Sequence, residues 1–231
     1  MVDMKLTALK YGETELSESM IFRDGDREKS RPISLTVYLI ETEGRRILVD
    51  AGCDTMPGFV LKHFCGPVDV LERYELAADD ITDVILTHGH HDHMEAVGHF
   101  RRATVWIQRA EYERYAERFL PRDASVRIFD EEERVCEGVL VKRIGGHTRG
   151  SSVVHVCCGT REFVMVGDEC YAKECLERGI PTGSSCDPTR SEDFIRTYRK
   201  GSAIPLLAHD DTILPGQNGF VCVFDSSGDD R

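Results

Sequence analysis

The stretch Thr87-His88-Gly89-His90-His91-Asp92-His93 is a His-x-His-x-Asp-His cluster, and three further residues with metal-binding side chains stand alone downstream. The seven candidate metal ligands, which supply imidazoles and carboxylates, are His88, His90, Asp92, His93, His147, Asp168 and His209. Borderline divalent metals bind such nitrogen and oxygen ligands. Two metal ions ~3.5–4 Å apart can turn water into a hydroxide nucleophile at neutral pH. The pattern therefore predicts a hydrolase with two metal ions.

Spacing within the cluster indicates how the ligands divide between the two metals. His88 and His90 are two residues apart, and Gly89 between them allows a sharp backbone path, so both can point at one metal. Asp92 and His93 are adjacent and are expected to point toward the second metal. Asp92 is also expected near the start of the following helix, where a carboxylate is favoured.

The predicted secondary structure places the remaining ligands at the ends of strands. Apolar, β-branched runs predict strands at 33–41, 45–50, 84–87, 104–107, 126–129, 139–144, 151–158, 161–166 and 204–208. Helices are expected at 59–65, 68–76, 95–101, 111–120 and 191–199. His88, Asp168 and His209 each closely follow an apolar strand, and His147 lies in a glycine-rich loop between two strands. Because strand ends lie at the rim of a sheet, these side chains are expected to converge on one open site.

Composition favours a single domain over residues 1–231 and argues against some classes of partner. Hydrophobic residues make up 41% of the chain and charged residues 30%, which is ordinary for a globular protein. The net charge of −12 argues against nucleic acid and anionic membranes as partners. It does not exclude a small-molecule substrate, because the field of two metal cations outweighs the surface average. The oligomeric state is expected to be monomeric or homodimeric.

The sequence also predicts a cytoplasmic location. No stretch approaches the ~18 apolar residues of a membrane span, and the segment 1–12 lacks the features of a secretory signal. The chain has nine cysteines, an odd number, and no CxxC pair. Free thiols in a reducing compartment account for such a set.

The His-x-His-x-Asp-His cluster, followed by a single His, a single Asp and a single His, resembles the metallo-β-lactamase-fold hydrolases over nearly the whole chain. This resemblance implies an α/β (α+β) fold, a four-layer αββα sandwich with the metals at the rims of the sheets. It implies that the first metal is held by His88, His90 and His147, and the second by Asp92, His93 and His209. Asp168 would bridge both metals together with a hydroxide. The two divalent ions would be Zn²⁺, although Mn²⁺, Fe²⁺ and Co²⁺ accept the same ligands.

Tyr171 narrows the resemblance to one branch of these hydrolases. The segment Asp168-Glu169-Cys170-Tyr171-Ala172-Lys173-Glu174 looks like that of the N-acyl-homoserine lactonases, the quorum-quenching branch. By this resemblance the enzyme opens a lactone or similar ester. Tyr171 would donate its phenol hydrogen to the substrate carbonyl, and Asp92 would carry a proton to the leaving oxygen. The candidates for an apolar acyl channel are Met20, Phe22, Met56, Phe59 and Phe64.

Other activities of the same fold remain alternatives. A thioester, a phosphodiester or a β-lactam could be the substrate, since two metals suit phosphoryl chemistry equally well. A metal-dependent redox protein is less favoured, because persulfide dioxygenases of this fold lose ligands of the second metal. Here Asp92, His93 and His209 are all retained.

Overall fold

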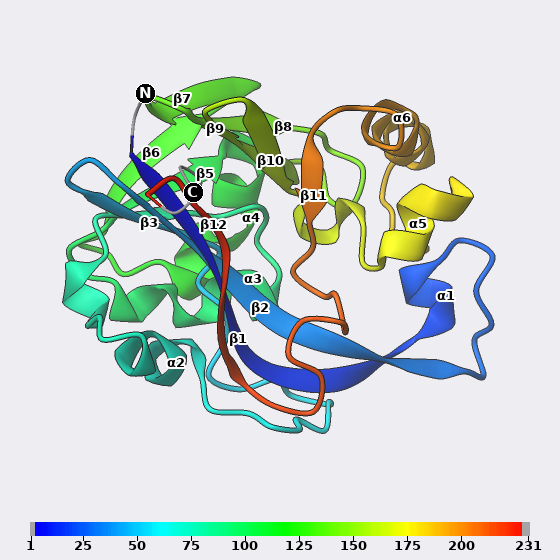
Figure 1. Cartoon of the computed structure of the whole chain (residues 1–231). Coiled ribbons are helices and arrows are strands. Elements are labelled where there is room, and N and C mark those ends of the chain that lie inside the picture. The colour runs from blue at the N-terminus through cyan, green and yellow to red at the C-terminus, as the bar shows by residue number, and fades with distance from the viewer. Residues whose placement is uncertain (1–2, 228–231) are drawn as a thin grey trace.

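The computed structural model describes residues 3–227, which form two β-sheets packed face to face with helices on the two outer faces (Figure 1). This is the α/β sandwich predicted from the sequence. Within residues 3–227, no helix combines the length and the apolar character needed to cross a membrane.

The first sheet has seven strands in the order β12-β1-β2-β3-β4-β5-β6. Their bounds are β1 (Met4–Ser17), β2 (Ser30–Thr42), β3 (Arg45–Val49), β4 (Asp83–Ile85), β5 (Thr104–Gln108), β6 (Ser125–Phe129) and β12 (Gly219–Asp225). The pairs from β12 to β3 are antiparallel, and those from β3 to β6 are parallel. The chain segments that follow β3 and β4 therefore leave the sheet at the same edge, which is where the candidate site begins.

The second sheet has five strands in the order β11-β10-β9-β8-β7. Their bounds are β7 (Glu132–Cys136), β8 (Val139–Arg143), β9 (Ser152–Cys158), β10 (Arg161–Met165) and β11 (Ile204–Leu206). The α-helices are α1 (Glu18–Ile21), α2 (Pro67–Arg73), α3 (His91–Met94), α4 (Arg109–Phe119), α5 (Lys173–Arg178) and α6 (Pro188–Tyr198). The short 3₁₀ helices are η1 (Ala78–Asp80), η2 (Glu95–His99) and η3 (Gly167–Glu169).

Three apolar clusters hold the four layers together. The central cluster lies between the sheets, where Ile40 and Ile47 of the first sheet belong to the same cluster as Val141 and Val154 of the second. A second cluster joins the outer face of the first sheet to α2 and η2, and a third joins the second sheet to α5 and α6. Because residues alternate between the two faces of a strand, β2 supplies both the central cluster and an outer one.

All nine predicted strands are present, and the predicted helices at 68–76, 111–120 and 191–199 correspond to α2, α4 and α6. The helix predicted at 95–101 is the shorter 3₁₀ helix η2. The long strand β1, the edge strands β7 and β12, and the helices α1, α3 and α5 were not predicted.

The prediction of a helix at 59–65 was wrong. The backbone of this segment pairs with β1, since Lys62 and Glu13 exchange N–H···O bonds of 2.9 and 2.8 Å. Cys65 N–H also donates to the carbonyl of Tyr11 at 2.9 Å. These bonds to a distant strand replace the local bonds of a helix, so the apolar spacing of the segment was misleading.

Candidate dinuclear metal centre

The seven candidate ligands come from five places in the fold and meet at one rim of the sandwich. The loop after β4 supplies His88 and His90, and the short helix α3 that follows supplies Asp92 and His93. His147 lies between β8 and β9, Asp168 lies in η3 directly after β10, and His209 follows β11. Five of the seven therefore lie in segments that follow strands, and for His88, His147, Asp168 and His209 this is the predicted placement.

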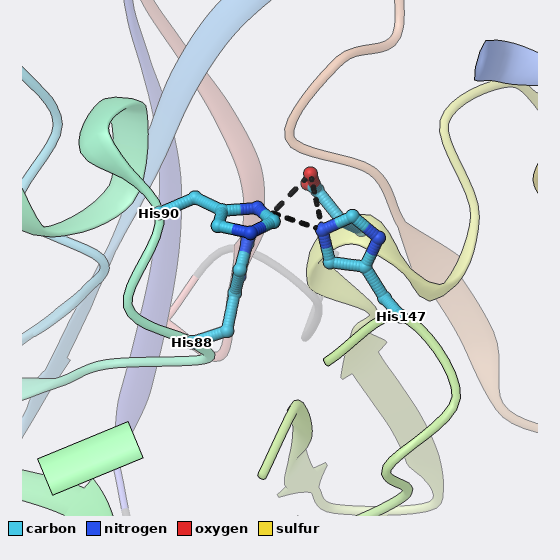
Figure 2. A group of neighbouring side chains, drawn as sticks. His88, His90 and His147 are labelled. Atoms are coloured by element: carbon cyan, nitrogen blue, oxygen red, sulfur yellow. Dashed lines mark hydrogen bonds and ion pairs between the residues drawn. The ribbon is translucent and has the colours of Figure 1, made fainter. Parts of the chain in front are cut away.

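The side chains form two neighbouring groups, each with ligand atoms within 4.8 Å of one another. The first group is His88, His90, His147 and Asp168, and the second is Asp92, His93 and His209. Figure 2 shows the three imidazoles of the first group pointing toward one another from two separate loops. Nδ1 of His90 lies 2.9 Å from Nε2 of His147. Each group has the number and type of donors that a borderline divalent metal takes.

Asp168 lies between the two groups and presents one carboxylate oxygen to each. Its Oδ2 is 3.3 Å from Nε2 of His147 and 3.6 Å from Nε2 of His88. Its Oδ1 is 3.0 Å from Nε2 of both His93 and His209. A single carboxylate is therefore placed to serve both groups.

The outer nitrogens of four imidazoles are held by oxygen acceptors, which fixes how the rings face. His93 Nδ1 donates to Asp50 at 2.7 Å, His147 Nδ1 to the Ser184 carbonyl at 2.6 Å, and His209 Nδ1 to the Ser34 carbonyl at 2.8 Å. His88 Nδ1 lies 3.1 Å from the Thr87 hydroxyl, whose own hydrogen goes to Asp50. With Nδ1 protonated in this way, each Nε2 lone pair can face the centre of the cluster.

Two buried imidazole nitrogens make no hydrogen bond within the described chain. They are Nε2 of His88 and Nε2 of His93, and both face Asp168. His93 Nε2 is only 3.0 Å from Asp168 Oδ1, but the two groups are not aligned for a hydrogen bond. A buried polar atom without a partner is costly unless something else binds it. The donor set therefore fits a pair of cations at this place.

The charges around the cluster support the same conclusion. Burial acts to lower the pKa of His93, but Asp168, Asp50 and Asp92 outweigh it and raise the pKa well above its usual value. Burial acts to raise the pKa of Asp168, but the surrounding imidazoles hold it well below its usual value. The carboxylates thus favour positive charge inside the cluster, which bound cations would supply.

Tyr171 contacts both groups, and its ring stacks on His209 of the second group at a centroid distance of 5.0 Å. Its hydroxyl donates to Asp168 Oδ2 at 2.6 Å and accepts from the Ser184 hydroxyl at 3.2 Å. Burial, together with the charge of Asp168, raises the pKa of Tyr171 well above its usual value. The phenol therefore keeps its proton at neutral pH and can act as a hydrogen-bond donor.

Asp50 is a functional residue that the sequence analysis missed as part of the site. It follows β3 and is buried, and its carboxylate accepts hydrogen bonds from Thr87 N, Thr87 Oγ1 and His93 Nδ1. It adopts a left-handed backbone, with φ of 64°. A carboxylate at the end of an apolar strand was the available signal, because it matches the placement of His88.

Glu169 is a second buried carboxylate that was not predicted. Its Oε1 accepts hydrogen bonds from the backbone N–H of Gly146 at 3.0 Å and of His147 at 3.1 Å, and from the Ser151 hydroxyl. Burial raises the pKa of Glu169 to about 7. These bonds anchor the loop that carries His147 to the short helix that carries Asp168.

A cavity of about 360 Å³ opens beside the cluster and reaches His90, Asp92, His147 and Asp168. Its other walls are mostly apolar and include Leu16, Met20, Ile33, Met56, Phe59, Tyr115, Phe119 and Tyr171. Three of the residues proposed for an acyl channel, Met20, Met56 and Phe59, therefore line it. The other two do not, because Phe22 packs in the cluster beneath α5 and Phe64 packs edge-on against Tyr11.

The four remaining histidines lie outside the two groups, as expected. His155 bonds Glu162 and the Tyr198 hydroxyl, and His99 pairs with Asp54. His91 lines the cavity, but its Nε2 is directed to the Thr55 carbonyl at 2.8 Å.

Comparisons with known proteins agree with the fold. An N-acyl homoserine lactonase from Bacillus thuringiensis is 25% identical over 233 residues, covering 89% of this chain and 93% of that protein. A solved N-acyl homoserine lactone hydrolase, with the product N-hexanoyl-L-homoserine at its catalytic metal centre, matches with a TM-score of 0.79. It is 24% identical and covers 91% of this chain and 94% of its own.

A dizinc quorum-quenching lactonase in complex with a product matches with a TM-score of 0.71 at 16% identity, covering 95% of this chain and 94% of its own. The model of the Metallo-beta-lactamase superfamily matches residues 31–199, well over half of the sequence. The chain therefore belongs to the metallo-β-lactamase superfamily.

Proposed function

We propose that this protein is a dimetal hydrolase that opens the ring of N-acyl homoserine lactones. The observation that carries the proposal is the position of Asp168, whose two oxygens face two separate groups of imidazoles beside an apolar cavity. The relatives named as N-acyl homoserine lactonases support the substrate class. Such a substrate has a polar ring for the polar cluster and an apolar acyl chain for the cavity.

The residues present would hold two divalent metal ions. His88, His90 and His147 would hold the first, Asp92, His93 and His209 the second, and Asp168 would contact both. Two bound cations would supply a hydroxide nucleophile at neutral pH and polarise the lactone carbonyl. Zinc is the proposed metal, because a structural relative is named as a dizinc lactonase and imidazole with carboxylate suits Zn²⁺.

Tyr171 and Asp92 would assist the reaction from the chain itself. The buried phenol of Tyr171 keeps its proton and lies at the wall of the cavity, so it would donate a hydrogen bond to the lactone carbonyl oxygen. Asp92 also lines the cavity, and its side chain is 15% exposed. Its carboxylate would take up a proton during attack and return it to the leaving oxygen.

The decisive experiment is a pH-indicator screen of the purified protein with lactones, thioesters, β-lactams and phosphodiesters, combined with elemental analysis of the same sample. We expect hydrolysis of N-acyl homoserine lactones above the other classes, with two metal ions per chain. Faster turnover of another class would replace the proposed substrate. One metal ion or none per chain, after loading with excess zinc, would contradict the dimetal site.

Removal of the metals is expected to lower the thermal stability of the protein. A ligand present at a thousand times its dissociation constant stabilises the folded state by about 4 kcal/mol. For a chain of this size, that corresponds to a fall in Tm of roughly 8–16 °C on chelation. Differential scanning calorimetry before and after EDTA dialysis measures the fall, and added Zn²⁺ should reverse it. Mg²⁺ is the control, because it prefers oxygen ligands and should restore nothing. An unchanged Tm after complete metal removal would contradict the prediction.

Truncating the wall of the cavity is expected to weaken hydrolysis of long-chain lactones selectively. Phe59→Ala removes ring contacts with an acyl chain, and losing the burial of one or two methylene groups costs about 0.8–1.6 kcal/mol. We therefore expect kcat/KM for an N-decanoyl lactone to fall about 4–15-fold, with little change for the N-butanoyl lactone. Val60→Ala is the matched control, because Val60 is 77% exposed and does not line this cavity. Equal losses for both chain lengths would show that Phe59 does not bind the acyl chain.

We also propose a cellular location, a substrate class and an oligomeric state for the protein. The cysteines within the described chain are all free thiols, which supports a reducing, cytoplasmic environment. The acidic composition supports a small-molecule substrate rather than nucleic acid. We expect a monomer or homodimer, which gel filtration with light scattering would distinguish.

A further inference from the structure

Glu111, in the first turn of α4, connects the two loops that carry the ligands of the first group. The residue is 1% exposed. Its Oε2 accepts a hydrogen bond from Gly89 N–H at 2.9 Å. Its Oε1 accepts from the Thr148 hydroxyl and from Gly150 N–H, both at 2.8 Å. Gly89 lies between His88 and His90, and Thr148 follows His147, so one carboxylate contacts both ligand loops.

These hydrogen bonds are not needed to complete the helix that carries Glu111. The N-cap of α4 is Gln108, whose side-chain oxygen accepts from Ala110 N–H at 2.6 Å. Within residues 3–227, Glu111 makes no ion pair, and its buried carboxyl oxygens accept three hydrogen bonds from the ligand loops. Both carboxylate oxygens of Glu111 therefore accept hydrogen bonds from the ligand loops.

The contact with Gly89 is possible only because the backbone lies close to α4. A Cβ atom at Gly89 would lie 2.0 Å from the ring of Tyr115, a residue on the same helix. The helix thus fixes the first loop by steric contact and by a hydrogen bond, and it fixes the second loop through the other carboxylate oxygen. His90 Nδ1 and His147 Nε2, one from each loop, lie 2.9 Å apart.

We infer that Glu111 is a positioning residue that sets the spacing between His90 and His147 and thereby controls the affinity of the first metal site. Among residues 3–227, neither a hydrogen bond nor an ion pair joins Glu111 to Asp92, His93 or His209 of the second group. The inference rests on the proposed dimetal function and assigns to α4 a role that neither ligand loop can fill alone. Outer hydrogen-bond partners of metal ligands change affinity by about 10–100-fold when removed.

The test compares Glu111→Gln with the control Glu117→Gln, which alters an exposed glutamate on the same helix. In Glu111→Gln, the amide NH₂ that replaces one oxygen must face an N–H or O–H donor, so at least one loop is released. Zinc affinities are measured by competition with a chromophoric chelator, which resolves two dissociation constants in the wild type. The absorption spectrum of the Co²⁺-loaded protein reports the coordination of each site independently of turnover.

We expect Glu111→Gln to raise one of the two zinc dissociation constants about 10–100-fold and to leave the other unchanged. The Co²⁺ spectrum should change for the same site only, and Glu117→Gln should match the wild type in both measurements. Unchanged constants, or equal increases in both, would overturn the inference.

A milder variant keeps the test informative if Glu111→Gln does not fold. Thr148→Val removes a single hydrogen bond to Glu111 and preserves the shape of the side chain. A smaller increase in the same dissociation constant would support the inference, and unchanged constants would refute it. If the wild type binds two metals but does not open lactones, the proposed substrate fails and the role of Glu111 stands. If the wild type binds fewer than two metals, both fail.

Discussion

Replacing Asp168 with alanine is expected to remove both bound metals and to abolish lactone hydrolysis. Asp168 presents Oδ2 to His88 and His147, and Oδ1 to His93 and His209. Without Asp168, the buried imidazoles of the two groups face one another with no carboxylate between them. Each group also loses the carboxylate oxygen that Asp168 presents to it. Metal-assisted stabilisation of the transition state is worth several kcal/mol, and a loss of about 4 kcal/mol lowers kcat/KM about 1,000-fold.

Elemental analysis after gel filtration and steady-state kinetics on an N-acyl homoserine lactone measure these two effects. Asp211→Ala is the matched control, because Asp211 is exposed and belongs to neither group. It should keep two metals and full activity. Asp168→Ala with two tightly bound metals and wild-type turnover would show that the carboxylate does not hold the metals, and the assignment of the site would have to be abandoned.

Replacing Tyr171 with phenylalanine is expected to leave the metals bound and to slow ring opening ~10–100-fold, which corresponds to ~1.4–2.7 kcal/mol of transition-state stabilisation. The ring is 5% exposed and its stacking on His209 does not need the hydroxyl, so the variant should fold normally. What the variant lacks is the phenol hydrogen, which is 2.6 Å from Asp168 and lies at the cavity wall. The loss should therefore fall on kcat more than on KM.

Tyr198→Phe is the control for the removal of a phenol hydroxyl. Tyr198 is on α6 and bonds His155, outside the two ligand groups, so its substitution should leave the rate unchanged. An unchanged rate in Tyr171→Phe would reduce Tyr171 to a packing role. Loss of metal from Tyr171→Phe would instead show that its hydrogen bond serves to orient Asp168.

The strand β1, which the sequence did not predict, depends for its stability on distant partners. β1 contains Lys10, which reads as a solvent-exposed residue but is 0% exposed in the fold. Its ammonium group donates to Glu13 and to the carbonyls of Ile213 and Leu214, more than 200 positions away in the chain. A charge can be buried only where such partners exist, and local patterning carries no information about them.

Within the site, the division between sequence and structure follows the same reasoning. The spacing of His88, His90, Asp92 and His93 is local, so the sequence alone identified these residues and divided them into two groups. His147, Asp168 and His209 were identified because each lies at the end of an apolar run or between two such runs. Glu111 and Asp50 were not, since their importance comes from contacts with loops on other elements.

The sequence by itself determined the fold class, the positions of most strands along the chain and the residue types available for a metal centre, because alternation, strand ends and ligand spacing are local properties of the chain. Only the tertiary structure decided that one oxygen of Asp168 faces each group, that Glu111 joins two ligand loops, and that Phe22 and Phe64 lie away from the cavity. These facts depend on how two sheets and their covering helices pack, and packing brings together side chains whose separation in the sequence has no bearing on their distance in space.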